Sequence, residues 1–187
     1  MRGARLGWSL LAAAFAGCDK PPAAPAPVSM SSTEPLPDAS PRDAWEARRR
    51  AWLAGDAKAV WESLCAASRE EKLRTQERAM DEMRRLEDDS LARALNPYGL
   101  EASKFRRMTA EEFCLYMIGG ASQVAAPVQA RMKAQVFVSA DIQGRTAICT
   151  IASTDGSSDI LVLVAERGSW KVDDAATARM RGGAPRK

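Results

Sequence analysis

The chain has 187 residues, 46% of them hydrophobic and 27% charged, which is typical of one globular domain with appended segments. Lys plus Arg (27) and Asp plus Glu (24) nearly balance, giving a net charge of +3, so the composition does not favour nucleic-acid binding. Histidine is absent, which excludes histidine-dependent triads, histidine-ligated zinc and imidazole pH switches. Four cysteines without a C-x-x-C pair exclude zinc-ribbon and thioredoxin-like motifs.

The N-terminus has the organisation of an export signal. Arg2 and Arg5 precede an apolar stretch over 6–15. This stretch is too short to span a hydrocarbon core, which needs about 20 helical residues. A basic start, a short apolar run and small residues after it predict a signal peptide over 1–17 that is removed on export.

The end of this segment reads Phe15-Ala16-Gly17-Cys18 and resembles the lipobox of bacterial lipoproteins, with Phe15 where that family usually has Leu. The resemblance implies that Cys18 is lipidated and becomes the first residue of the mature chain. Two or more acyl chains anchor a protein stably without spanning the membrane. We therefore expect a protein anchored by lipid to a cell membrane and facing the periplasm or the exterior, with the choice between inner and outer membrane open.

Two segments are expected to lie outside any folded core. Residues 18–42 form a Pro/Ala-rich tether, whose 24 residues after Cys18 reach roughly 75 Å at about 3.1 Å per residue. Residues 176–187 carry four basic and no acidic side chains and are predicted to be a disordered basic tail. The folded domain is then expected over 43–175.

The first part of this domain has helical signals. Ser40 is a predicted cap with Pro41 in the first turn, Gly55 ends the helix, and Asp56 caps the next one. Capping boxes are predicted at Ser68, opening a long charged helix, and at Thr109. The first of these helices should break at 96–99, and Gly119-Gly120 should end the second.

The second part changes to the period of strands. Residues 132–139 alternate as a half-buried strand, with Met132, Ala134, Val136 and Val138 on one face. Turn signals then separate strands over 146–152, 160–164 and 170–173, of which 160–164 is apolar on both faces and should be central or covered twice. Helices followed by an antiparallel meander predict an α+β fold, with N-terminal helices packed on a curved antiparallel sheet of about four strands.

Two short segments carry a further resemblance. The sequence Trp-Leu-Ala-Gly-Asp-Ala-Lys-Ala-Val-Trp over 52–61 and the hairpin over 163–173, which ends in Trp-Lys-Val-Asp, look like the nuclear transport factor 2-like superfamily. The order of elements over about 130 residues also fits that family. The resemblance implies a cone in which the sheet wraps the helices around an internal pocket, and dimerisation through the sheet.

Candidate site residues have two interpretations each. Trp61, Tyr116 and Trp170 either line a pocket for an apolar ligand or belong to the core, and the core interpretation is favoured. Cys65 and Cys114 are the preferred disulfide pair in an oxidising compartment, with three buried small apolar residues, Cys149 included, as the equal alternative. No catalytic residue, metal site or cofactor is predicted. Solvated caps or turns are expected for the acids at strand ends, Asp141, Asp155, Asp159, Asp173 and Asp174.

These observations favour a membrane-anchored, non-enzymatic lipoprotein that presents a small binding or assembly domain, with an envelope protein as a candidate partner and no nucleic acid. One alternative is an isomerase- or dehydratase-like enzyme for a small apolar substrate, which predicts a buried carboxylate facing Tyr98 or Tyr116. Another is a homodimeric scaffold that pairs through the sheet. It predicts an exposed outer sheet face around Phe137 and alternate residues of 160–164.

Overall fold

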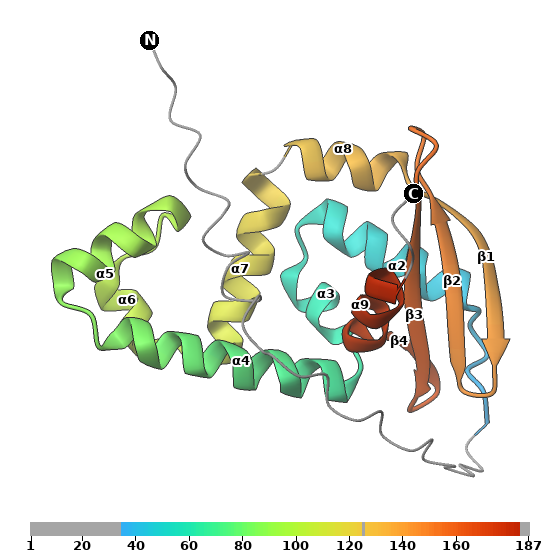
Figure 1. Cartoon of the computed structure of the whole chain (residues 1–187), viewed down its shortest axis with the longest axis horizontal. Helices are drawn as coiled ribbons and strands as arrows, with labels where there is room; N and C mark the ends of the chain where they lie inside the picture. The colour runs from blue at the N-terminus through green and yellow to red at the C-terminus, as the bar shows by residue number, and fades with distance from the viewer. Residues whose placement is uncertain (1–34, 125, 184–187) are drawn as a thin grey trace. The chain divides into compact units, whose positions relative to one another are not determined.

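The computed structural model describes residues 35–124 and 126–183, apart from the side chains of 121–128 and 183. Its helices are α2 (Pro41–Ala54), α3 (Ala57–Glu62), α4 (Ala66–Arg84), α5 (Asp88–Leu95), α6 (Ala102–Arg107), α7 (Ala110–Val124), α8 (Ala126–Ala134) and α9 (Asp174–Gly183), with a 3-10 turn η1 (Asn96–Tyr98). Its strands are β1 (Val136–Gln143), β2 (Thr146–Ala152), β3 (Ser158–Glu166) and β4 (Ser169–Val172). They form an open antiparallel sheet in the order β1-β2-β3-β4 (Figure 1). The predicted α+β class is confirmed.

The predicted caps and stop of the first two helices are confirmed in detail. The Ser40 hydroxyl accepts a hydrogen bond from the Asp43 amide at 3.2 Å, while the Asp43 carboxylate accepts from the Ser40 amide at 3.0 Å. Gly55 ends α2 with a left-handed φ of 73°, which glycine adopts without a steric penalty. Asp56 then caps α3 by accepting from the Ala59 amide at 2.9 Å. Pro41 and Arg42, predicted to belong to the tether over 18–42, therefore lie in α2.

The capping box predicted at Ser68 is wrong. Helix α4 begins at Ala66 with Cys65 as its cap, and the Cys65 sulfur accepts from the Ser68 amide at 3.4 Å. Ser68 is buried in the first turn, where its hydroxyl accepts from the Asp174 amide at 3.0 Å. The hydroxyl is therefore used to hold the start of a distant helix. The expected long helix is also divided, into α4 and α5.

The box at Thr109 is confirmed, but Gly119-Gly120 does not end α7. The Thr109 hydroxyl accepts from the Glu112 amide at 3.2 Å and the Thr109 amide donates to the Glu112 carboxylate at 2.7 Å. The helix continues through both glycines to Val124. Helices α7 and α3 are in contact at Gly119, where an added Cβ would lie 3.8 Å from the Ala57 Cβ. A small residue at this position therefore lets the two helices pack closely.

The strand predicted over 132–139 begins later in the chain than expected, and the face opposite to the predicted apolar one is buried. Its first residues belong to α8, and β1 starts at Val136. Phe137 is buried against Trp45, with ring centroids 5.9 Å apart, whereas Val136 and Val138 are 60% and 54% exposed. The register with β2 shifts between Phe137 and Ser139. This bulge breaks the simple alternation on which the prediction depended.

Strand β3 is covered on both faces, as predicted for an apolar run in the middle of a sheet. Leu163 faces the helices, while Val162 is buried on the side of α9. The expected disordered tail from Ala176 is wrong, because these residues continue α9 to Gly183. The Val162 amide donates to the Thr177 hydroxyl at 3.0 Å and the Asp173 amide donates to the Val162 carbonyl at 2.9 Å. These two bonds continue the pairing of β3 beyond the end of β4 and dock the helix.

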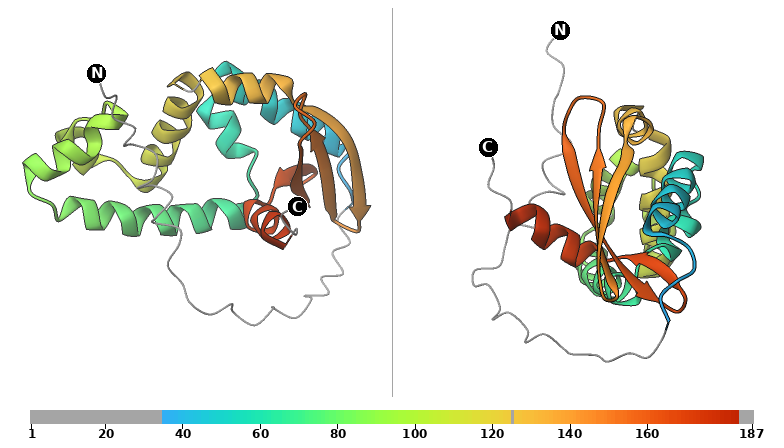
Figure 2. Two further views of the ribbon diagram at one scale, coloured as in Figure 1. Left: turned by 45° about the horizontal axis from the view of Figure 1, so that its top comes forward. Right: turned by 90° about the vertical axis from the view of Figure 1, so that its right-hand side faces the viewer.

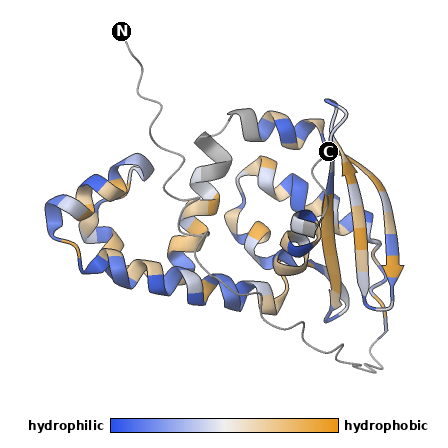
Figure 3. Cartoon of the chain, in the orientation of Figure 1, coloured by the Kyte–Doolittle hydropathy of each residue, from blue (hydrophilic) through white to orange (hydrophobic). Residues whose placement is uncertain are grey.

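Two hydrophobic clusters support the described part of the domain. The sheet core lies between the sheet and α2, α3 and α7; its members include Trp45, Trp61, Leu64, Phe137, Leu163, Trp170 and Val172. The arm core lies where α4, α5, α6 and α7 meet; its members are Met80, Leu91, Leu95, Leu100, Phe105, Met108 and Phe113. Figure 2 shows α5 and α6 standing away from the sheet, connected to it by α4 and α7. Figure 3 shows the long α4 as mostly hydrophilic, with apolar colour concentrated on β2, β3 and parts of α7.

Thr177→Val is expected to lower the free energy of unfolding by about 1–3 kcal/mol, because it keeps the shape of the side chain but leaves the Val162 amide without its acceptor. Thr177→Ser retains the hydroxyl and should stay closer to the parent chain. Urea denaturation followed by tryptophan fluorescence measures both. Equal stability of Thr177→Val and the parent chain would contradict the docking of α9.

Candidate functional site

The three residues proposed to line a pocket do not come together. Trp61 and Trp170 are buried in the sheet core, in agreement with the core interpretation. Tyr116 is half-buried beside the arm core, and its hydroxyl donates to the Tyr98 carbonyl at 2.7 Å. Lys104 lies over the Tyr116 ring, with its ammonium nitrogen 5.7 Å from the ring centroid.

The described cysteines, Cys65, Cys114 and Cys149, are all buried and free. The expected pairing of Cys65 with Cys114 is thus not formed in the structure. The Cys65 sulfur is occupied at the cap of α4, where it donates to the Ser68 hydroxyl at 3.2 Å. Burial raises the pKa of Cys114, and it raises the pKa of the Cys149 thiol to about 11, so neither is set up as a thiolate nucleophile.

Cys18, the predicted lipidation site, lies outside the described residues. In the part of the chain that the structure describes, no helix is both long and apolar enough to cross a membrane. Within the same residues, no three cysteine or acidic side chains gather as a metal site.

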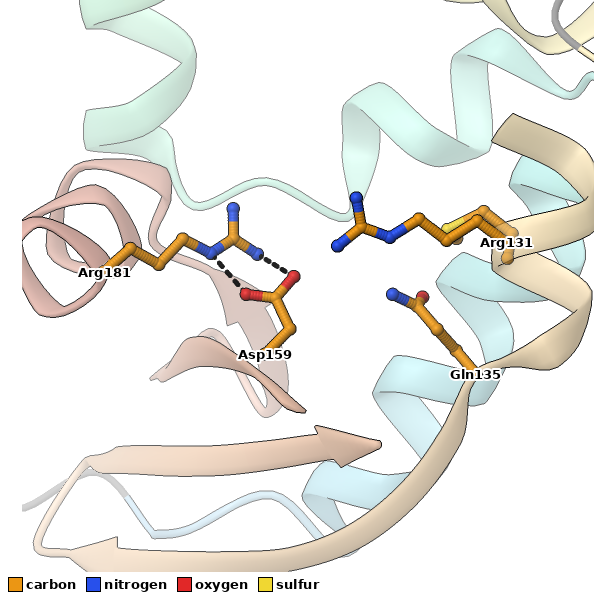
Figure 4. Close-up of a pocket in the computed structure, with 5 residues that line it drawn as sticks. Arg131, Gln135, Asp159 and Arg181 are labelled. Carbon is orange, nitrogen blue, oxygen red and sulfur yellow. Dashed lines mark hydrogen bonds and ion pairs between the residues drawn. The ribbon is translucent and has the colours of Figure 1, made fainter. Parts of the chain in front are cut away.

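An open pocket of about 380 Å³ lies where α8, the start of β3 and the end of α9 approach one another (Figure 4). Arg131 and Met132 come from α8, Gln135 from the link between α8 and β1, Asp159 from β3 and Arg181 from α9. Figure 4 shows Arg131 and Gln135 extending from one side toward Asp159 and Arg181 on the other.

One wall of the pocket is a bidentate ion pair. The Arg181 Nε lies 2.7 Å from the Asp159 Oδ1, and the Arg181 Nη2 donates to the Asp159 Oδ2 at 2.8 Å. Two parallel charge-assisted contacts hold the plane of the guanidinium and neutralise its charge. The carboxylate is about a quarter exposed, so both partners remain accessible from the pocket.

The opposite wall is held by Arg49 of α2. Its guanidinium donates to the Met132 and Lys133 carbonyls, both at 2.7 Å, and so satisfies two carbonyls at the end of α8. This contact fixes the last turn of the helix, from which Arg131 projects. Among the described residues, neither Arg131 nor Gln135 has a side-chain hydrogen bond or ion pair.

Asp155, in the hairpin between β2 and β3, is the further acid near this wall. Its carboxylate accepts from the Ser157 hydroxyl at 2.6 Å and from the Ser157 amide at 2.9 Å. These hydrogen bonds lower the pKa of Asp155, and the positive charge of Arg131 contributes in the same direction. The carboxylate is therefore already engaged within its own turn.

Sequence reasoning did not find this pocket. The sequence pattern predicts a disordered tail around Arg181 and a solvated strand end at Asp159. The available signal was the basic character of the tail together with an acid at the start of a buried strand. That signal does not specify the pairing, which depends on α9 folding back across the sheet.

Comparison of the chain with protein-family models, with curated proteins and with solved structures found no match.

The raised pKa of Cys149 predicts a pH dependence of stability. An unfolded thiol ionises near pH 9 and the folded one near 11, so between these values the folded state retains a proton that the unfolded state has lost. The free energy of unfolding therefore falls as pH rises from 9 to 11, by at most about 1.4 kcal/mol per pH unit.

Urea denaturation of the parent chain and of Cys149→Ala at several pH values measures this effect, because the variant removes the thiol and leaves the other titrating groups in place. The stability advantage of the parent chain over the variant should shrink across this window. A constant difference would contradict the prediction.

Proposed function

We propose that this protein is a lipid-anchored lipoprotein of the bacterial cell envelope whose folded domain binds a partner or ligand. The observation that carries the proposal is the Phe15-Ala16-Gly17-Cys18 motif after a basic start and a short apolar run. A proline-rich segment separates Cys18 from α2, which suits a domain held at a distance from a membrane surface.

We propose that the domain is a variant of the nuclear transport factor 2-like cone. The order of helices before an antiparallel meander supports this, as do the Gly55-Asp56 junction between α2 and α3 and the Trp170–Val172 segment in β4. The arm core is an addition to that plan, because it packs α5 and α6 away from the sheet.

A binding role is supported by the open pocket, since its wall at α8 presents polar side chains that have no partner among the described residues. The enzyme alternative needs a buried carboxylate facing Tyr98 or Tyr116. The contact described for the Tyr116 hydroxyl is instead with the Tyr98 carbonyl.

Cys18→Ala is expected to abolish incorporation of a labelled fatty acid and to release the exported protein from the membrane fraction. The reason is that the thiol of Cys18 is the proposed acceptor of the lipid. Metabolic labelling in a bacterial host followed by fractionation measures both effects. Cys114→Ala is the matched control and should retain the label. Label that persists in Cys18→Ala would overturn the anchor.

A homodimeric scaffold remains a second candidate, because strand β1 is an edge of the sheet and carries exposed apolar side chains. Val136, Val138 and Ile142 are 60%, 54% and 48% exposed. The outer sheet face predicted around Phe137 and alternate residues of 160–164 is not exposed, since Phe137 and Val162 are buried and Ile160 and Val164 are half-buried. The exposed apolar edge of β1 is the surface that would meet a second copy.

If β1 pairs with a second copy, Val138→Lys should raise the dimer dissociation constant at least tenfold, because it places a charge in the apolar contact. Ala92→Lys, at an exposed position on α5, is the control for the added charge. Sedimentation velocity over a range of concentrations measures both variants. A parent chain that is monomeric throughout would contradict the scaffold.

A further inference from the structure

The pocket between α8 and α9 offers an excess of hydrogen-bond donors. The two accessible oxygens of Asp159 already face Arg181, so the carboxylate is largely occupied as an acceptor. Arg131 contributes a guanidinium, which has five donors and no acceptor, and Gln135 contributes an amide. A ligand that is complementary to these donors must therefore supply hydrogen-bond acceptors.

The charges of the residues that line the pocket indicate the net charge of a suitable ligand. Arg181 is neutralised by Asp159, which leaves Arg131 as the uncompensated charge among the residues that line the pocket. Asp155 also lies within the electrostatic reach of Arg131, and its hydrogen bonds with Ser157 leave its negative charge in place, so it reduces the positive potential at this wall. A dianion would meet the Asp159 carboxylate at close range, so a single negative charge suits the site better than two.

We propose that this pocket binds the carboxylate of a small organic molecule, with Arg131 as its principal partner and Gln135 as a second hydrogen-bonding group. A carboxylate carries one charge, and its two coplanar oxygens match the fork of a guanidinium. The inference deepens the proposed binding role of the domain and does not depend on the lipid at Cys18.

The shape of the pocket limits the rest of the ligand. A volume of about 380 Å³ is near the lower end of the range for small-molecule sites, which spans about 300–1,000 Å³. Met132 gives the lining a half-buried apolar surface beside Arg131. Because the pocket is open, a small molecule bound by its carboxylate would contact this lining on one side only.

Two elements that are distant in the sequence give this pocket its geometry. Arg49 of α2 holds the end of α8, and the bidentate pair with Asp159 holds Arg181 of α9 against the start of β3. Both walls are therefore positioned by contacts that do not involve the donors left for a ligand. The backbone of both walls is held in this way, whereas the exposed Arg131 side chain becomes ordered only when a ligand binds.

The test is a titration of the full chain, in a neutral detergent, with N-acetyl-alanyl-alanine and with its C-terminal amide. Shifts of the arginine and glutamine side-chain resonances in NMR spectra report binding. The free carboxylate is expected to bind in the millimolar range and to shift Arg131 and Gln135, while the amide should bind at least tenfold more weakly. Added sodium chloride should weaken binding of the carboxylate.

Arg131→Gln should lower the affinity for the carboxylate probe at least tenfold. Arg107→Gln, at an exposed position on α6, removes the same charge and should leave the affinity unchanged. Equal binding of acid and amide would overturn the proposal, as would binding that Arg131→Gln does not alter.

Inorganic phosphate and acetate complete the titration. Phosphate that binds through Arg131 more tightly than both carboxylates would overturn the assignment of the ligand class. Absence of binding by acetate and by the peptide acid would overturn the site itself. None of these outcomes affects the fatty-acid labelling of Cys18, so the failure of this inference is distinguishable from the failure of the anchor.

Discussion

The described domain depends on one short contact between segments that are more than a hundred residues apart. Leu64, in the link between α3 and α4, forms a parallel bridge with Val172 at the end of β4. The Val172 amide donates to the Ser63 carbonyl at 2.8 Å, and the Cys65 amide donates to the Val172 carbonyl at 2.9 Å. Leu64 and Val172 are both almost completely buried, so these bonds are made away from water, where an unpaired backbone group is most costly.

The bridge also sets where two helices begin. Helix α4 starts at Ala66 and α9 starts at Asp174, each two residues beyond a bridge partner. Ser68 accepts from the Asp174 amide, and Lys72 pairs with the Asp174 carboxylate at 2.8 Å. The long helix that leads to the arm core and the helix that carries Arg181 are thus tied to the same point. The position of the pocket wall at α9 therefore follows from the way the helices join the sheet.

This arrangement separates the parts of the domain that stabilise it from the part proposed to bind. The sheet core and the arm core bury most of the large aromatic side chains, and the free thiols lie in apolar surroundings. Arg131 and Gln135, whose side chains have no partner among the described residues, lie at an open rim between α8 and α9. A binding site at a rim leaves the interior closely packed, which is consistent with the proposed binding role of the domain.

Local chemistry was sufficient to predict the features that a few neighbouring residues decide. Ser40, Gly55, Asp56 and Thr109 act as caps and stops because their hydrogen bonds and backbone angles involve residues within four positions in the chain. The change from helical to strand period likewise placed β2, β3 and β4 and the α+β class, since that period is a property of the segment itself.

Tertiary structure decided the features that depend on residues far apart in the chain. In β1, Phe137 faces the core and Val136 and Val138 lie outside, because the helices cover that face of the sheet, and a pattern of alternation alone does not say which face is covered. Ser68 does not cap its helix, because its hydroxyl accepts from the Asp174 amide. The predicted tail forms α9, because the backbone of Val162 in β3 bonds to the Thr177 hydroxyl and to the Asp173 amide. The sequence by itself determined the α+β class, the caps at Ser40, Asp56 and Thr109 and the strands β2, β3 and β4, and it indicated the candidate anchor at Cys18. Only the fold brought Arg131 and Arg181 to one pocket, because Arg49 of α2 holds the end of α8 that carries Arg131, and Asp159 of β3 pairs with Arg181.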